Sequence, residues 1–330
     1  MQSFKNFAGC LAILLFIGQF LALASTIRAE PLIAPDLVAW WRANAPTCKA
    51  PDGFEFPAKQ HKDGSCDDGD ITLFSGLLCT AGETAGCEAV RRSQAASGQW
   101  FRSPRRAQTN NLGLNNSFSH DMALGVQHYV AHTSDIAALE RWMIWLDFHR
   151  VCWIGAGNNC VKSPFLRYCT NDSENGCTLR PGDLAVLGSM AYRYSAWPPS
   201  QNVADLLDQA RNHVFDITAI SANLNKEGFS QHLTGVEILL LRKINLNDAK
   251  LDAAAWILSN KQPKNPFFKY LSQGATPAVA TLVMTSCPAK GSDLSKEKNE
   301  WSWERADSEQ AWKNTMLWDC IFMADLLNNK

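Results

Sequence analysis

One short segment, RSPRRAQTNNLGLNNSFSHDMALGV (102–126), gathers residue types that can bind and transform a polar ligand. Three arginines, several asparagines and a His-Asp pair stand directly before an apolar run, where packing alone needs none of this polarity. Guanidinium groups bind carboxylates with two hydrogen bonds, and His and Asp side chains exchange protons. The segment is either a solvated charged loop or one wall of a site, and we favour the site.

An aromatic ring, amides and guanidinium groups together suit a polysaccharide groove, because a ring packs on the apolar face of a sugar and amides bond its hydroxyls. Two other segments share parts of this composition: CTNDSENGCTLRPGD (169–183) and WSWERADSEQAWKNTMLWDC (301–320). The candidate substrate-binding residues are Trp100, just before the first segment, and, within the three segments, Arg102, Arg105, Arg106, Asn115, Asn116, Arg180, Trp301 and Trp303.

Carboxyl groups are the first candidates for catalysis. Glycoside hydrolysis needs a protonated carboxyl for the leaving oxygen and a carboxylate that activates water or attacks directly. Asp121 is our first choice because the arginines, asparagines and histidine of its own segment can bind a polar ligand. The carboxylate candidates are Asp70, Asp121, Asp183, Glu304 and Asp307, with Asp68 a weaker one.

Elimination is the alternative chemistry. It needs a base that removes the proton beside a uronate carboxylate, and a cation that neutralises this carboxylate. His120 is the candidate base, and Arg102, Arg105 or Arg106 is the candidate cation.

A weak internal repeat links three of the aspartates. The stretches GDITLFSGLL (69–78), HDMALGVQHY (120–129) and GDLAVLGSMA (182–191) each place an Asp before an apolar helical run that contains Gly. N-capping explains each Asp separately, and small residues allow helices to approach closely. If alternate helices form an inner ring, however, the three carboxylates lie on one rim around a shared cavity.

Metal binding has little support in the sequence. The oxygen-rich NDSEN stretch suggests calcium at Asp172 and Glu174, but no acidic residue stands at the twelfth position that an EF-hand requires. No close CxxC pair is present, which disfavours zinc. We therefore expect no cofactor, with calcium as the alternative.

The spacing of apolar residues predicts an almost entirely α-helical chain, because three- and four-residue steps dominate and alternating runs are scarce. Short turns and longer polar loops alternate between the helices, as expected for a layered array of hairpins. The expected helices are Ala34 to Ala45, Asp70 to Ala81, Thr84 to Ala96, Ser119 to Ala131, Ser134 to Arg150, Asp183 to Trp197, Val203 to Asn223, Ser230 to Lys243, Asn247 to Asn260 and Ser308 to Leu327.

The hairpin order, the polar loops before alternate helices and the Trp- and acid-rich segment 301–320 resemble the six-hairpin (α/α) toroids of glycoside hydrolases and polysaccharide lyases. The resemblance covers most of the chain after its N-terminus, and it rests on architecture and residue types. It implies an all-α, disulfide-stabilised toroid, and it assigns no catalytic residue by itself.

The N-terminus predicts export. Lys5 precedes an apolar run from Phe7 to Ala24, and a small-residue cleavage site follows at Ala24 or Ala29. Residues 1–29 are therefore expected to be a signal peptide, and 30–330 a single domain. A retained membrane anchor is the alternative, although the run is at the short limit for a spanning helix.

The ten cysteines that follow Cys10 point to disulfides in an oxidising compartment, the periplasm or the exterior. Three neighbouring pairs share one eight-residue step, so pairing in chain order is the simplest arrangement. These three pairs are Cys79/Cys87, Cys152/Cys160 and Cys169/Cys177.

Charge and motifs exclude several function classes. The formal net charge of −1 gives no global basic character for nucleic acid. GxSxG, P-loop and HExxH motifs do not occur, which argues against α/β-hydrolases, nucleotide enzymes and zincins. We expect a monomeric, exported glycoside hydrolase that acts on an acidic or substituted bacterial polysaccharide. A polysaccharide lyase, a non-catalytic glycan-binding or envelope-assembly protein, and a purely structural helical protein remain alternatives.

Overall fold

The computed structural model describes residues 30–61, 63–111, 118–155, 157–169, 177–294 and 316–329. Residues 32–330 form one compact unit and residues 1–31 another, of which only Glu30 and Pro31 are described. The expected signal peptide thus lies outside the described residues. The described chain is mostly helical, with short antiparallel strand pairs and five disulfides.

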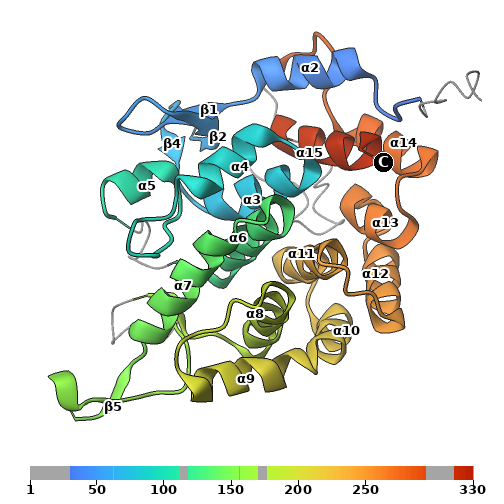
Figure 1. The fold of residues 1–330 in the computed structure, drawn as a ribbon. Coiled ribbons are helices and arrows are strands. Elements are labelled where there is room, and N and C mark those ends of the chain that lie inside the picture. The colour runs from blue at the N-terminus through green and yellow to red at the C-terminus, as the bar shows by residue number, and fades with distance from the viewer. Residues whose placement is uncertain are drawn as a thin grey trace, which may run out of the picture. The chain divides into compact units, whose positions relative to one another are not determined.

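The elements follow one another as helices with few strands between them (Figure 1). The helices are α2 (Pro35–Asn44), α3 (Ile71–Ala81), α4 (Thr84–Arg91), α5 (Pro104–Gln108), α6 (His120–Thr133), α7 (Ile136–Phe148), α8 (Pro181–Tyr194), α9 (Gln201–Arg211), α10 (Val214–Leu224), α11 (Phe229–Lys243), α12 (Ala249–Lys261), α13 (Pro266–Gln273), α14 (Pro277–Ser286) and α15 (Leu317–Asn328). The strands are β1 (Thr47–Lys49), β2 (Glu55–Pro57), β3 (Lys59–Gln60), β4 (Cys66–Asp67), β5 (Cys152–Ile154) and β6 (Val161–Lys162), paired β1–β2, β3–β4 and β5–β6.

The predicted all-α class is confirmed in its coarse form, with some differences in the elements. The stretch expected as one helix over 203–223 is two helices, α9 and α10, which break at Asn212 and His213 so that α9 packs on α8 and α10 on α12. Helices α5, α13 and α14 were not predicted, and α15 begins at Leu317 within the described part of the expected last helix.

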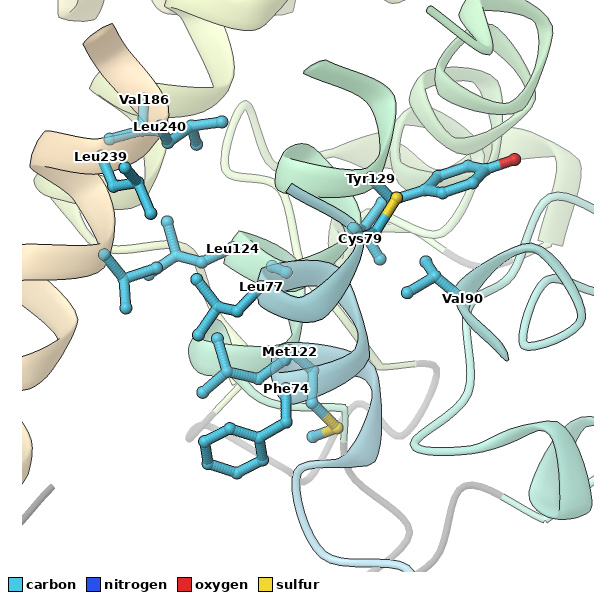
Figure 2. Packing of buried hydrophobic residues seen from close by; sticks show 14 of the residues in the cluster. Phe74, Leu77, Cys79, Val90, Met122, Leu124, Tyr129, Val186, Leu239 and Leu240 are labelled. Atoms are coloured by element: carbon cyan, nitrogen blue, oxygen red, sulfur yellow. The ribbon is translucent and has the colours of Figure 1, made fainter. Parts of the chain in front are cut away.

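Mostly buried helices are separated along the described chain by one to three helices that keep an exposed face. Helix α3 is buried over its whole length, and α6, α8, α11 and α15 are buried over most of theirs, whereas α4, α9 and α12 keep an exposed face. Helix α3 contacts α6 and α15, and α6 contacts α8 and α11. Figure 2 shows side chains of this core, among them Phe74 and Leu77 of α3 and Met122 and Leu124 of α6.

Glycines let the buried helices approach closely, as the repeat predicted. A Cβ atom at Gly76 of α3 would lie 2.0 Å from the carbonyl oxygen of Gly125 on α6, and one at Gly188 of α8 would lie 2.2 Å from that of Leu207 on α9. No side chain fits at such distances. These contacts fix the position of α3 along the axis of α6, and therefore the relative positions of the residues at the starts of the two helices.

The disulfides join cysteines in chain order, which confirms the simplest pairing. The pairs are Cys48–Cys66, Cys79–Cys87, Cys152–Cys160, Cys169–Cys177 and Cys287–Cys320. The last one ties α15 to the end of α14, and five disulfides are typical of proteins outside the cytoplasm. Within the described residues, none of the helices has the length and hydropathy to cross a membrane.

We expect removal of the Cys287–Cys320 disulfide to lower the free energy of unfolding by about 4 kcal/mol. A disulfide restricts the unfolded chain, and it removes more conformational entropy from that state when the loop that it closes is longer. The sequence separation of this pair is 33, against 8 for Cys152–Cys160 on an exposed hairpin, for which we expect about 2.5 kcal/mol. Urea unfolding of the two double Cys→Ser variants measures both values. Equal losses would contradict this ranking.

Candidate functional site

The starts of α3, α6 and α8 meet at one rim of the helical unit, which we call the acidic rim and define by Asp70, Asp121 and Asp183. A guanidinium nitrogen of Arg102 lies 3.6 Å from an Asp70 carboxylate oxygen, and both Asp70 and Asp121 act electrostatically on Arg102. His120 Nδ1 lies 2.6 Å from Asp183 Oδ2, which joins α6 to α8. The predicted convergence of the three aspartates therefore has support from specific contacts.

Helix capping accounts for only one of these aspartates. Asp183 accepts a hydrogen bond from the backbone N–H of Arg180 at 2.7 Å. Asp70 precedes α3 with a left-handed backbone, φ 59°, and makes no capping hydrogen bond with its side chain. Such a backbone is uncommon outside glycine and is most tolerated by Asn and Asp. Asp70 and Asp121 are thus present at the rim without a capping role.

Asp121 has an altered acidity. Burial, followed by the negative charge of Asp70, raises the pKa of Asp121 to about 6, against the opposing effects of His120, Ser119 and Arg180. Among the described residues, the Ser119 hydroxyl donates a hydrogen bond to the Asp121 carboxylate at 3.4 Å, a distance at which the bond is weak. A carboxyl with a pKa close to neutrality beside an ion-paired carboxylate has the properties of a general acid.

His120 is held by its surroundings. Its ring is buried, pairs with Asp183 and meets the ring of Tyr168 edge to face, with 5.5 Å between the ring centroids. A carboxylate on one ring nitrogen fixes the orientation of an imidazole. The pair can therefore serve as an oriented base or as a support for the neighbouring Asp121.

Tyr168 is a site residue that sequence reasoning missed. It is 1% exposed, packs against Phe118 and Trp142, and its hydroxyl has no hydrogen-bond partner among the described residues. Burial, then the charges of Asp183 and Asp121, raises the pKa of Tyr168 well above its ordinary value. The phenol therefore lies within electrostatic reach of two rim carboxylates, as a neutral hydroxyl.

Glu237 of α11 is the second missed residue. Burial, and after it the charge of Asp183, raises the pKa of Glu237 to about 8, so this side chain is near the rim although it is far away in sequence. A signal was present, because Glu237 is the one charged residue in the run LTGVEILLL (233–241). Burying a carboxyl group within an apolar helical run costs free energy unless other groups in the tertiary structure interact with it.

Glu237 leads to a pH prediction. Its ordinary pKa is 4.5, so between about pH 4.5 and 8 the folded protein keeps a proton that the unfolded chain has lost. The stability from this group is complete below pH 4.5 and is lost as the pH rises through 8. Relative to Glu237→Gln, the wild-type free energy of unfolding should fall by at most about 1.4 kcal/mol per pH unit in this range.

Urea unfolding of both proteins at a series of pH values measures this difference. The exposed Glu227→Gln is the control, and its curve should run parallel to that of the wild type. Parallel curves for Glu237→Gln as well would show that Glu237 titrates normally.

The three arginines of segment 102–126 have different partners. Arg105 and Arg106 both form ion pairs with the buried carboxylate of Asp68, which also accepts a hydrogen bond from Ser103 at 2.9 Å. These contacts attach α5 to the stretch before α3. Arg105 and Arg106 thus share one carboxylate, and among the described contacts Arg102 is the one of the three arginines that pairs with a carboxylate of the rim. The carboxylate of Asp68, the weaker catalytic candidate, is held in these two ion pairs.

Trp100 is a core residue and not the expected stacking platform. It is 1% exposed, and its ring packs edge-on against that of Tyr129 on α6. Arg180, in contrast, is exposed at the start of α8 and acts electrostatically on Asp121. The remaining candidates lie outside the described residues: Asn115, Asn116, Asp172, Glu174, Trp301, Trp303, Glu304 and Asp307.

Metal donors do not converge at the rim within the described residues. The one group close enough to hold an ion is Cys79, Cys87 and His132, and these two cysteines are bonded to each other. A cavity of about 530 Å³ lies at the opposite ends of the helices, lined by residues of the last turns of α3, α6, α11, α13 and α15. It contains none of the rim residues, so we separate it from the candidate site.

Comparison with known proteins finds no family model that matches the chain, no similar curated protein and no similar solved structure.

Proposed function

We propose that the chain is a glycoside hydrolase that cleaves a polysaccharide at the acidic rim, with Asp121 as the general acid and Asp70 as its partner carboxylate. Asp121 would protonate the leaving oxygen, and Asp70 would activate water or attack the sugar directly. The observation that carries the proposal is the half-buried Asp121, whose pKa is raised by the nearby charge of Asp70, which in turn pairs with Arg102. Two carboxyl groups in unlike surroundings are the usual basis for separate acid and base roles.

The arrangement of helices is consistent with the proposed (α/α) toroid. Mostly buried helices are separated by one to three half-exposed ones, the starts of α3, α6 and α8 share the rim, and the ends of α3, α6, α11, α13 and α15 share the opposite cavity. Parallel inner helices that begin on one side produce this distribution. In such a fold the long loops and the site lie on the side where the inner helices begin.

Elimination is the second candidate, and the His120–Asp183 pair favours it. An imidazole oriented by a carboxylate can remove the proton beside a uronate carboxylate, with Arg102 available to neutralise that carboxylate. Asp121, whose pKa is raised to about 6, has the property that a general acid needs, so we rank hydrolysis first. A non-catalytic glycan-binding protein would use the same surface without turnover.

We further propose that the protein acts in the periplasm or outside the cell, on a bacterial envelope or exopolysaccharide. Five disulfides support this location, because they persist in oxidising compartments.

The test is incubation of the purified, disulfide-intact protein with neutral, amino-substituted and uronate polysaccharides. New reducing ends and the ultraviolet absorbance of unsaturated uronates are followed together. Reducing ends alone would support hydrolysis, whereas both signals together would support elimination and His120 as the base. Binding without either signal would reject catalysis for these polymers and leave the glycan-binding alternative.

A further inference from the structure

The connection between α7 and α8 carries exposed aromatic rings on a small hairpin. Trp153 on β5 is 61% exposed, and Phe165, just after β6, is 44% exposed. The two rings contact each other edge to face, with 6.2 Å between their centroids. Figure 1 shows β5 standing away from the helices at the end of α7. Trp153 and Phe165 together form what we call the hairpin platform.

Other exposed apolar side chains of this hairpin have partners of their own. Ile154 and Val161 lie opposite each other in the β5–β6 pair, where cross-strand neighbours pack together. Phe148, at the end of α7, is 68% exposed and has the ammonium group of Lys162 4.4 Å from its ring centroid. Trp153 and Phe165 are the exposed rings beyond α7 that contact each other, so they form one platform.

The base of the hairpin is firmly attached to the helices. Asp147 of α7 forms an ion pair with Arg150 at 2.8 Å and accepts a hydrogen bond from the Ser200 backbone N–H at 2.8 Å. Arg150 in turn donates to the Ser163 carbonyl oxygen at 2.7 Å, and a disulfide joins Cys152 to Cys160. A two-stranded hairpin is marginally stable alone. Here it is anchored, so the two rings are held in place before a ligand arrives.

Chain geometry places the platform near the acidic rim. Trp142 of α7 stacks on the ring of Tyr168, with 5.9 Å between the ring centroids. Phe165 and Tyr168 are three residues apart, which limits their Cα atoms to a separation of about 11 Å. The Tyr168 ring lies 5.5 Å from that of His120. A polymer bound at Asp121 would therefore extend over the platform within a few sugar units.

From this continuity we infer that the hairpin platform binds the polysaccharide chain away from the cleavage point, with the face of a sugar ring packed on the Trp153 indole. The inference rests on the proposed function and adds a binding subsite to it. Aromatic rings with exposed faces suit the apolar face of a sugar, and Phe165 keeps the indole from rotating freely.

The test compares Trp153→Ala with Trp256→Ala, since Trp256 on α12 is equally exposed, at 62%, and lies outside the connection. Trp153→Ala should raise KM for a long polymer about three- to tenfold with kcat unchanged, and should leave a short oligosaccharide unaffected. Trp153→Phe should restore most of the loss. Trp256→Ala should behave as wild type.

The platform would be rejected if Trp153→Ala kept the wild-type KM, or if it lost activity equally on long and short substrates. It would also be rejected if Trp153 controlled a monomer–dimer change in gel filtration. Trp153-dependent sedimentation with vesicles of phosphatidylethanolamine and phosphatidylglycerol would reject it as well. If the wild type cleaves no polymer, fluorescence titration with the same polymers separates the two proposals. Quenching that is lost in Trp153→Phe keeps the platform and rejects the enzyme, and no quenching rejects both.

Discussion

Replacing Asp121 by Asn is expected to lower kcat on the polysaccharide substrate by about 100- to 10,000-fold while polymer binding is retained. The amide has the shape of the carboxyl but cannot donate the proton that the leaving oxygen needs. Because burial already favours the neutral form of Asp121, the uncharged Asn should be tolerated by the fold. Initial rates of reducing-end formation and fluorescence titration with the polymer measure the two properties.

Asp36→Asn is the matched control for this variant. Asp36 is exposed at the start of α2, pairs with Lys290 at 3.1 Å, and has no contact with the rim. Its kinetics should equal those of the wild type. With Asp121 as the general acid, wild-type activity should also decline as the pH rises above about 6, where this carboxyl loses its proton. Normal turnover in Asp121→Asn would reject the assignment of the acid.

Replacing Gly125 by Ala is expected to lower the free energy of unfolding by about 1–3 kcal/mol or more. The added Cβ would lie 2.2 Å from the Thr72 carbonyl oxygen and 2.4 Å from the Leu73 Cα, both backbone atoms of α3. Backbone cannot rotate away as a side chain can, so α3 must move relative to α6. The same movement would shift Asp70 against Asp121 and lower activity in the molecules that fold.

Gly182→Ala provides the control in urea unfolding. Gly182 lies in the first turn of α8, and its added Cβ would meet only the Ile217 side chain, at an ordinary 3.6 Å. Alanine also has the higher helix propensity, so stability should stay the same or rise by up to about 1 kcal/mol. If Gly125→Ala were as stable as Gly182→Ala, the close packing of α3 on α6 would not be required.

Some elements missed by the periodicity had local signals. Helices α13 and α14 are short, yet each begins with a capping residue followed by proline: Asn265-Pro266 and Thr276-Pro277, where the cap side chain accepts from the backbone N–H three residues later. The break between α9 and α10 has no such signal. No Gly or Pro stands at 212–213, and the break follows from the different partners of the two helices.

The sequence by itself determined the helical class, the Asp residues at three helix starts and the small residues behind them, and it favoured the simplest disulfide pairing without fixing it. All of these depend on spacing along the chain, which sets the helical period and the length of each closed loop. Close approach through glycine could also be expected from the repeat, although its partner helices could not.

Only the tertiary structure decided which groups share a site. Asp68 forms ion pairs with Arg105 and Arg106, and Trp100 is buried in the core. Glu237 and Tyr168, from other parts of the chain, lie near the rim. Electrostatic energy and burial depend on distances in space and on the exclusion of water, and spacing along the sequence does not fix either of them between separate helices.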